Sequence, residues 1–151
     1  MAVALELARR GLGRVWPNPA VGCVLVRAGQ VVGRGWTQPG GRPHAETEAL
    51  DRAGRRAQGA TAYVSLEPCA HQGETPPCVE ALIRAGITRC AIALEDPDPR
   101  ASGRGIARML EAGLVVQTGI LADHARELNE GFFSRINKGR PAITLKFATT
   151  L

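Results

Sequence analysis

The sequence predicts an α/β protein with a mixed sheet and helices on both faces of that sheet. From Tyr63 onward, apolar runs of strand length alternate with segments of helical periodicity, which is typical of strand–helix–strand units. Before that point, two apolar runs at residues 21–26 and 30–36 flank Ala28-Gly29, a pattern that indicates a β-hairpin. A hairpin adds antiparallel pairing, so we expect a mixed sheet rather than a purely parallel one.

The elements of the first half follow in order. Residues 2–10 carry apolar side chains at helical spacing and are followed by Gly11, a residue typical of helix C-termini. Residues 16–19 form a rigid loop, because two prolines restrict the backbone on either side of Asn18. After the hairpin and a Gly/Pro-rich loop at 37–43, Pro43 predicts a helix that runs to about Ala57, since proline suits the first helical position.

The second half alternates strands with helices. Strands are expected at 61–66, 88–94 and 114–118, and a long proline-containing loop at 67–77. Helices are expected at 78–85, closed by Gly86, at 105–112, and from 122 to about 136.

The last residues form a separate pattern. Ile143, Leu145 and Phe147 alternate with polar residues, which indicates one more strand. We therefore expect a domain at 1–139 and a C-terminal strand or linker at 140–151. That strand would begin a further segment or pair within an oligomer.

Composition favours one soluble globular domain. The chain has 151 residues, 44% hydrophobic and 22% charged, which is sufficient for a single core. It has no apolar run of membrane-spanning length and no signal-peptide pattern, so we expect a cytoplasmic protein without a membrane partner. The net charge of +5 indicates either a solvated arginine-rich surface or attraction to an anionic substrate, a phosphate or a nucleic acid. Because only 4% of residues are aromatic, a platform that stacks single-stranded bases is disfavoured.

Two short motifs predict a zinc site with a chemical function. His44-Ala45-Glu46 is followed by Glu67-Pro68-Cys69 and, nine residues after Cys69, by Cys78. His44, Cys69 and Cys78 would be three ligands for an ion that prefers four, which leaves one position for water. Glu46 is a poor fourth ligand and is better suited to take a proton from that water and pass it to a leaving nitrogen.

The setting of these residues supports a metal rather than a disulfide. Cys69 and Cys78 lie in polar, proline-rich sequence, whereas Cys23 and Cys90 lie in apolar runs and are expected in the core. His44 and Cys78 each follow proline at an expected helix start, where free amides and the helix dipole favour thiolate. Ala45 is small enough to let a planar ring approach the metal.

Two other functions remain open at this point. A structural zinc site in a non-catalytic binding domain would need a fourth protein ligand, for which His71 is the nearby candidate. A nucleic-acid base deaminase would suit the positive charge, but the long segment between the cysteines and the scarce aromatics oppose it.

The motifs resemble those of the cytidine-deaminase-like superfamily, in which His-x-Glu is combined with Pro-Cys-x-x-Cys. Here eight residues separate the cysteines instead of two. The segment 67–78 instead resembles the deaminase domain of the bifunctional riboflavin-biosynthesis protein, and the similarity extends over 17–22, 41–46, 95–97 and 103–105.

This resemblance implies a three-layer α/β/α sandwich around a mixed five-stranded sheet, with Zn²⁺ as the cofactor. The implied reaction is hydrolytic deamination of 2,5-diamino-6-ribosylamino-4(3H)-pyrimidinone 5′-phosphate to 5-amino-6-ribosylaminouracil 5′-phosphate and ammonia. It also implies a homo-oligomer, a dimer or larger, and no nucleic-acid partner. In the bifunctional protein a reductase domain follows; residues 139–146 resemble its first strand, so we expect no reductase activity from residues 1–151.

The resemblance further implies that Asn18, His71 and Asp96, together with Ala45, contact the substrate. By itself the sequence allows Asn18 equally as a turn residue, and for Asp96 a turn with Pro97 is a strong competitor. For His71 the alternative is a solvated loop residue, but the pocket is favoured because His71 lies two residues from the ligand Cys69. Three positions depart from the family pattern: Thr37 replaces a histidine, Glu74 an arginine or lysine, and Asp98 an asparagine. A carboxylate near a phosphate opposes binding, so either Arg100 or Arg104 compensates for Glu74, or the substrate sits differently, or turnover is weak.

Overall fold

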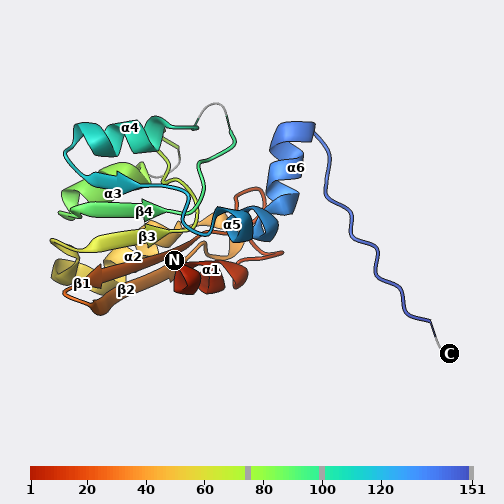
Figure 1. Ribbon diagram of the computed structural model, residues 1–151, viewed down its shortest axis with the longest axis horizontal. Coiled ribbons are helices and arrows are strands. Elements are labelled where there is room, and N and C mark those ends of the chain that lie inside the picture. Colours follow the sequence, from red (N-terminus) through yellow and green to blue (C-terminus); the bar gives the residue numbers. More distant parts are fainter. Residues whose placement is uncertain (74–75, 99–100, 150–151) are drawn as a thin grey trace.

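The computed structural model describes residues 1–73, 76–98 and 101–149, and within them a five-stranded sheet lies between two layers of helices (Figure 1). The strand order is β2-β1-β3-β4-β5. β1 pairs antiparallel with β2 and with β3, whereas β3, β4 and β5 are parallel. The predicted α/β class, with a hairpin that makes the sheet mixed, is therefore confirmed. The strands are β1 Gly22–Arg27, β2 Gln30–Trp36, β3 Thr61–Val64, β4 Arg89–Ile92 and β5 Val115–Gln117.

The helices lie where apolar periodicity predicts them, with three differences. They are α1 Ala2–Arg9, α2 Ala45–Ala53, α3 Cys78–Arg84, α4 Arg104–Glu111, α5 Ala122–Leu128 and α6 Glu130–Lys138, together with two short 3₁₀ turns, η1 Pro39–Gly41 and η2 Gly54–Ala57. None of these described helices is both long enough and apolar enough to span a bilayer.

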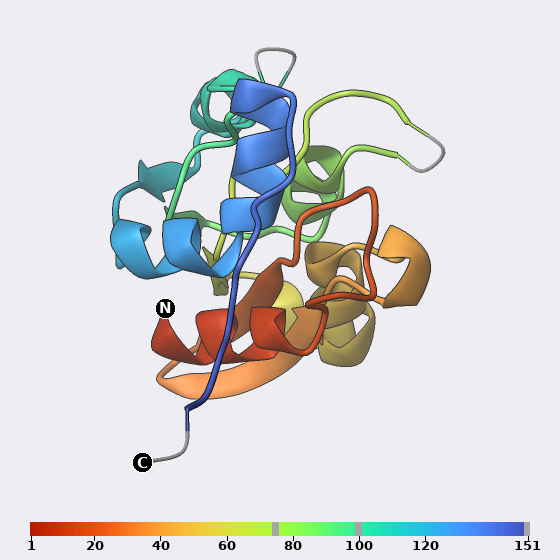
Figure 2. The same cartoon turned by 90° about the vertical axis from the view of Figure 1, so that its right-hand side faces the viewer.

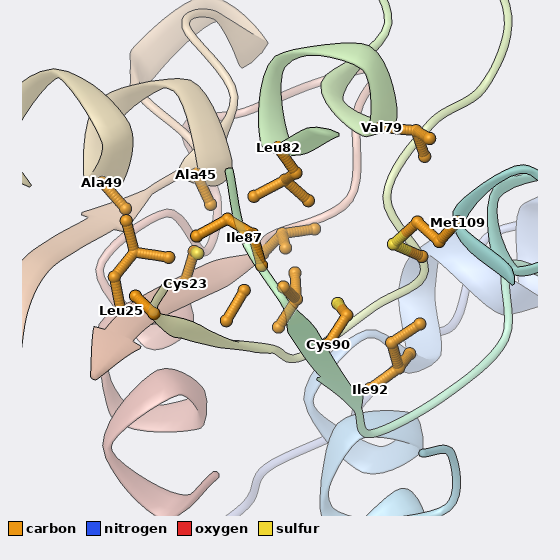
Figure 3. Packing of buried hydrophobic residues seen from close by; sticks show 14 of the residues in the cluster. Cys23, Leu25, Ala45, Ala49, Val79, Leu82, Ile87, Cys90, Ile92 and Met109 are labelled. Carbon is orange, nitrogen blue, oxygen red and sulfur yellow. The ribbon is translucent and has the colours of Figure 1, made fainter. Parts of the chain in front are cut away.

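Strand alternation decides which helices cover which face of the sheet. Cys23 and Leu25 of β1 point into the larger core cluster, which α2, α3 and α4 cover (Figure 3). Val24, between them, points to the opposite face and packs with residues of α1. On β4, Cys90 and Ile92 join the larger cluster, and Ala93 just beyond the strand packs with residues of α1 and α5. Cys23 and Cys90 are thus core residues, as predicted.

α2 lies unusually close to β2 because the facing strand positions are glycines. A Cβ atom on Gly35 would lie 2.1 Å from the Ala45 carbonyl oxygen, and one on Gly33 would lie 2.2 Å from the Ala49 carbonyl oxygen. Ala45 and Ala49 are fully buried at this contact, and the Glu48 Cβ atom would lie 2.9 Å from a Cβ atom on Gly35. The fold therefore holds the N-terminus of α2 at a fixed position against the sheet.

The start of α2 differs from the prediction. The helix begins at Ala45 rather than at Pro43, and His44 is the extended residue that precedes it, with φ −70° and ψ 160°. Its first turn carries Glu46 and Glu48, whose charges favour a helix N-terminus. Its end is also earlier than predicted, because Gly54 leaves the helical conformation and the chain tightens into η2.

The single helix predicted for 122–136 is wrong. Asn129 adopts φ −106° and ψ 23° and separates α5 from α6. Its buried amide accepts a hydrogen bond from the Ala20 N–H and donates one to the Ala20 carbonyl, both at 2.9 Å. This contact with a residue 109 positions away directs α6 toward the end of the sheet where the long loops gather (Figure 2).

The strand predicted near the C-terminus, which is expected to pair with a further segment or within an oligomer, stays a prediction. Residues 141–149 extend away from the domain and pair with none of the five strands (Figures 1 and 2). Ile143, Leu145 and Phe147 are 80–88% exposed. Their alternation is that of a strand, but a strand requires a hydrogen-bonding partner.

Candidate metal centre

Three potential metal ligands converge where α2 and α3 begin. His44 immediately precedes α2, Cys78 is the first residue of α3, and Cys69 lies in the loop that follows β3. Their ligand atoms all lie within 4.8 Å of one another. Among the described residues this group has three members, and neither Glu46 nor His71 joins it.

The spacing of the ligand atoms fits a tetrahedral ion. His44 Nδ1 lies 3.7 Å from Cys69 Sγ and 3.3 Å from Cys78 Sγ. Zn–S bonds of about 2.3 Å and a Zn–N bond of about 2.0 Å at tetrahedral angles would separate sulfur from nitrogen by about 3.5 Å. Two thiols and one imidazole also form a donor set that zinc prefers. The cluster therefore fits Zn²⁺ in both its chemistry and its dimensions.

Local hydrogen bonds favour negative charge on one sulfur. The Cys78 thiol, and then His44, donate to Cys69 and lower the pKa of the Cys69 thiol to about 4. The Cys78 backbone N–H, at the start of α3, also points at Cys69 Sγ from 3.3 Å. The hydrogen bond to Cys69 and burial raise the pKa of Cys78, while the bond with Cys69 raises the pKa of His44. A cation among these three groups would replace the protons that they share.

Glu46 is the acidic group next to the cluster. Only 3% of its surface is exposed, and it lies within hydrogen-bonding reach of the Cys78 thiol. Burial, followed by the charge of Cys69, raises the pKa of Glu46 to about 7. A carboxyl group with this pKa can both accept and release a proton near neutral pH. Its catalytic role remains a prediction, and its position agrees with that role.

A cavity of about 230 Å³ opens beside the cluster. His44, Glu46 and Cys69 line this cavity, so a bound molecule would face two of the ligands and the acidic group. This volume lies just below the range of pockets that hold drug-sized ligands, and it suits a single small molecule.

Three of the four residues predicted to contact the substrate line the cavity, and the fourth does not. Asn18, His71 and Asp96 all line the cavity, although His71 is exposed at its rim. Asn18 Nδ2 also donates to the Gly41 carbonyl at 2.8 Å, so this side chain has a structural role as well. Ala45 is fully buried in the core beneath α2 (Figure 3), and its side chain does not line the cavity.

Two of the three positions that depart from the family pattern line the cavity, and the third lies outside the described residues. Thr37 and Asp98 line the cavity. The buried Thr37 hydroxyl accepts from the Val21 N–H at 3.0 Å and donates to the Pro19 carbonyl at 3.2 Å, which ties the 17–21 loop to β2. Glu74 and Arg100 fall outside the described residues. Arg104, the other expected compensating cation, is exposed and does not line the cavity.

Sequence analysis missed one wall of the cavity, which α6 supplies. Phe132, Arg135 and Ile136 all line the cavity, as does Arg42 from the loop before α2. Arg135 donates to the Pro17 carbonyl at 2.6 Å and lies over the Trp16 ring. No motif marks these residues, because their proximity to the cluster depends on the break at Asn129.

Comparison with known proteins agrees with this geometry. Residues 1–94 match the family described as the cytidine and deoxycytidylate deaminase zinc-binding region. The riboflavin biosynthesis protein RibD of Escherichia coli is 50% identical over all 151 residues, which make up 41% of that protein. The diaminohydroxyphosphoribosylamino-pyrimidine deaminase of Buchnera aphidicola is 48% identical over 141 residues, covering 93% of this chain and 96% of that protein.

A solved structure of a relative also matches the fold of this chain. RibD of Acinetobacter baumannii superposes with a TM-score of 0.89 and 49% identity over 93% of this chain and 40% of its own. The chain thus spans about two fifths of its RibD relatives and nearly the whole of the Buchnera deaminase. Because the zinc-binding region and the full fold both match, the chain belongs to the cytidine and deoxycytidylate deaminase zinc-binding family, among the deaminases of riboflavin biosynthesis.

Proposed function

We propose that this chain is a zinc-dependent aminohydrolase of riboflavin biosynthesis. It converts 2,5-diamino-6-ribosylamino-4(3H)-pyrimidinone 5′-phosphate and water to 5-amino-6-ribosylaminouracil 5′-phosphate and ammonia. The similarity to the Buchnera deaminase over nearly the full length of both proteins supports this substrate. The name of that relative describes a diamino, hydroxy, phosphoribosylamino pyrimidine as the compound deaminated.

The observation that carries the proposal is that the three ligand atoms converge beside a small cavity, which His44, Cys69 and Glu46 all line. A zinc ion held by His44, Cys69 and Cys78 would supply a Lewis acid that activates water as a nucleophile. A purely structural zinc would take a fourth protein ligand, and His71 is not within the ligand group of the described residues.

The side chains of the protein then have separate tasks. The Glu46 carboxylate takes a proton from water and returns it to the departing amino nitrogen, so that the group leaves as ammonia. Cys78 and His44 hold their positions because both sit at helix starts, and the close contact of α2 with Gly35 fixes one of these starts. Burial of Glu46 keeps the carboxylate away from bulk water during this transfer.

The charges of the cavity suit a substrate with an anionic end. Arg42 and Arg135 line the cavity with Asp96 and Asp98. We assign the phosphate to the side of Arg135, because guanidinium groups bind phosphate oxygens with paired donors and the carboxylates would repel them. Asp96 and Asn18 face the pyrimidine, whose ring carries both donors and acceptors.

The proposal extends to the surroundings of the domain. We propose that residues 1–139 form the deaminase domain and that residues 140–151 lead toward a further segment, since the described part of this tail is exposed and apolar. We also propose a cytoplasmic homo-oligomer. Light scattering on the purified chain would give a mass of twice 16.0 kDa or more if this is correct, and 16.0 kDa if it is not.

Ammonia release tests the function directly. The zinc-loaded protein should release ammonia from the phosphorylated diaminopyrimidine, and much less from cytidine, guanine or single-stranded DNA. Chelated protein should be inactive and recover with zinc. Glu46→Gln should lose about 10²–10⁴-fold in turnover while it retains zinc and fold. Preferred turnover of DNA would favour the nucleic-acid alternative, and an unchanged rate in Glu46→Gln would contradict the mechanism.

A further inference from the structure

Glu67 has a role that the zinc motif alone does not suggest. It lies two residues before the ligand Cys69, in the loop after β3, and only 5% of its surface is exposed. A buried carboxylate is costly unless hydrogen bonds compensate for its lost hydration. Glu67 therefore needs hydrogen-bond donors around its carboxylate group.

Both carboxylate oxygens accept hydrogen bonds from backbone amides of one distant segment. Oε1 accepts from the N–H groups of Gly105 at 2.8 Å and Ile106 at 3.1 Å. Oε2 accepts from the N–H groups of Gly103 at 3.0 Å and Asp96 at 3.2 Å. The Glu67 backbone N–H also donates to the Leu94 carbonyl at 2.9 Å. One residue thus binds both ends of the loop between β4 and α4.

The contact is close enough to require glycine at its centre. A Cβ atom on Gly105 would lie 2.2 Å from the Pro68 carbonyl and 3.1 Å from Glu67 Oε1. Gly103 has φ +72°, a conformation that glycine adopts readily, and this turns its N–H toward the carboxylate. Sequence and geometry therefore agree that the start of α4 is held directly against the metal-ligand loop.

The loop that Glu67 holds forms a wall of the cavity. Asp96, Asp98 and Ala101 line the cavity. The Asp98 N–H donates to Asp96 Oδ1 at 2.9 Å, so the two acidic residues move together. Without the hydrogen bonds to Glu67, the backbone of Asp96 would lose its attachment to the loop that carries Cys69.

We propose that Glu67 is a positioning residue that couples the metal-ligand loop to the described residues of the substrate-facing loop, 94–98 and 101–104, and so sets the affinity for substrate. Glu67 also lines the cavity, but its two carboxylate oxygens are occupied by four backbone N–H groups, and it is not part of the metal-ligand group. Its loss should therefore raise KM more than it lowers kcat. This inference rests on the proposed function for its kinetic readout.

Two variants separate this role from a general loss of stability. Glu67→Gln keeps the shape of the side chain but turns an amide NH₂ toward two of the four N–H donors. Glu80→Gln is the matched control, because Glu80 binds Arg108 of the same helix α4 at 2.7 and 3.2 Å and does not line the cavity. Both variants weaken the attachment of α4, but only the first releases the loop.

Steady-state kinetics should give a KM at least tenfold higher for Glu67→Gln, with kcat within about threefold of the wild type and zinc content unchanged. Glu80→Gln should keep the wild-type KM. Amide hydrogen exchange should accelerate at residues 96, 103, 105 and 106 in Glu67→Gln and remain slow in α2.

An unchanged KM in Glu67→Gln, loss of its zinc, or failure of this variant to fold would each overturn the proposal. If the wild type releases no ammonia from the phosphorylated substrate, the proposed function fails. The exchange experiment then still decides whether Glu67 holds the loop.

Discussion

Replacing Gly35 with alanine tests the link between the fold and the metal centre. Gly35 lies on β2 beneath the first turn of α2, and an added Cβ atom would lie 2.1 Å from the Ala45 carbonyl oxygen and 2.6 Å from the Ala49 N–H nitrogen. Ordinary van der Waals contact begins at 3.4 Å, so α2 would have to move away by about 1.3 Å. Both atoms belong to the backbone, and no side-chain rotation can relieve the overlap.

The size of this shift sets the expected losses of stability and of zinc affinity. Overpacking of a core costs about 1–3 kcal/mol when side chains can adjust, and a backbone overlap belongs at the upper end of that range. We therefore expect Gly35→Ala to lower the free energy of unfolding by about 3 kcal/mol. His44 immediately precedes Ala45, and its ring would move by a distance larger than the roughly 0.2 Å that a metal–ligand bond tolerates. Zinc affinity should fall at least tenfold.

The assay is urea unfolding of the metal-free protein, combined with competitive zinc titration of the folded protein. Gly131→Ala is the matched control, because Gly131 lies in α6, is exposed, and has no atom within 4 Å of an added Cβ. This control should be more stable by about 0.5–1 kcal/mol, since alanine favours helix. Wild-type stability and zinc affinity in Gly35→Ala would refute the argument that close contact with β2 positions His44.

Three further predictions concern Asn129, α6 and the C-terminal segment. Asn129→Ala should lower the free energy of unfolding by about 2–4 kcal/mol in denaturant titrations, because it leaves two buried backbone groups of Ala20 without partners; a loss below 0.5 kcal/mol would show that water replaces the amide. Arg135→Ala should raise KM for the phosphorylated substrate by about tenfold or more, whereas Arg126→Ala, an exposed arginine of α5, should not; equal KM values would place the phosphate elsewhere. Removal of residues 141–151 should change the midpoint of thermal unfolding by no more than a degree or two, because Ile143, Leu145 and Phe147 contribute exposed surface; a large drop would reveal contacts of the tail.

Local sequence patterns sufficed for most of the fold and for the metal ligands. The hairpin, the parallel strands and most helices follow from apolar periodicity and from glycine or proline at their ends. His44, Cys69 and Cys78 could be predicted because ligand type and spacing are local properties of a sequence. The structure brings their ligand atoms together within 4.8 Å.

The errors arise where a long-range contact overrides local preference. Residues 122–136 carry a helical pattern throughout, but the hydrogen bonds between Asn129 and Ala20 divide it. The division depends on a residue far away in the chain, and periodicity contains no information about it. The strand pattern of the C-terminal segment stays a prediction, because its partner would lie outside the five described strands.

The same limit applies to the walls of the cavity. Arg135 reaches the cavity only because α6 starts where Asn129 places it. Glu67 was recognised as part of a motif, but its four hydrogen bonds to the segment 96–106 depend on how β4 and α4 meet. Ala45 is the opposite case. It lies inside the predicted motif, but its side chain faces the core instead of the cavity.

X-ray absorption at the zinc edge of purified, zinc-loaded protein tests the central claim most directly. We expect one zinc per chain with two sulfur neighbours at about 2.3 Å and two lighter neighbours at about 2.0 Å. Of these, His44 supplies one and exchangeable water supplies the other, so that a small anion added to the sample replaces only the water. A second nitrogen or third sulfur from the protein that no added anion displaces would contradict a metal centre built for catalysis.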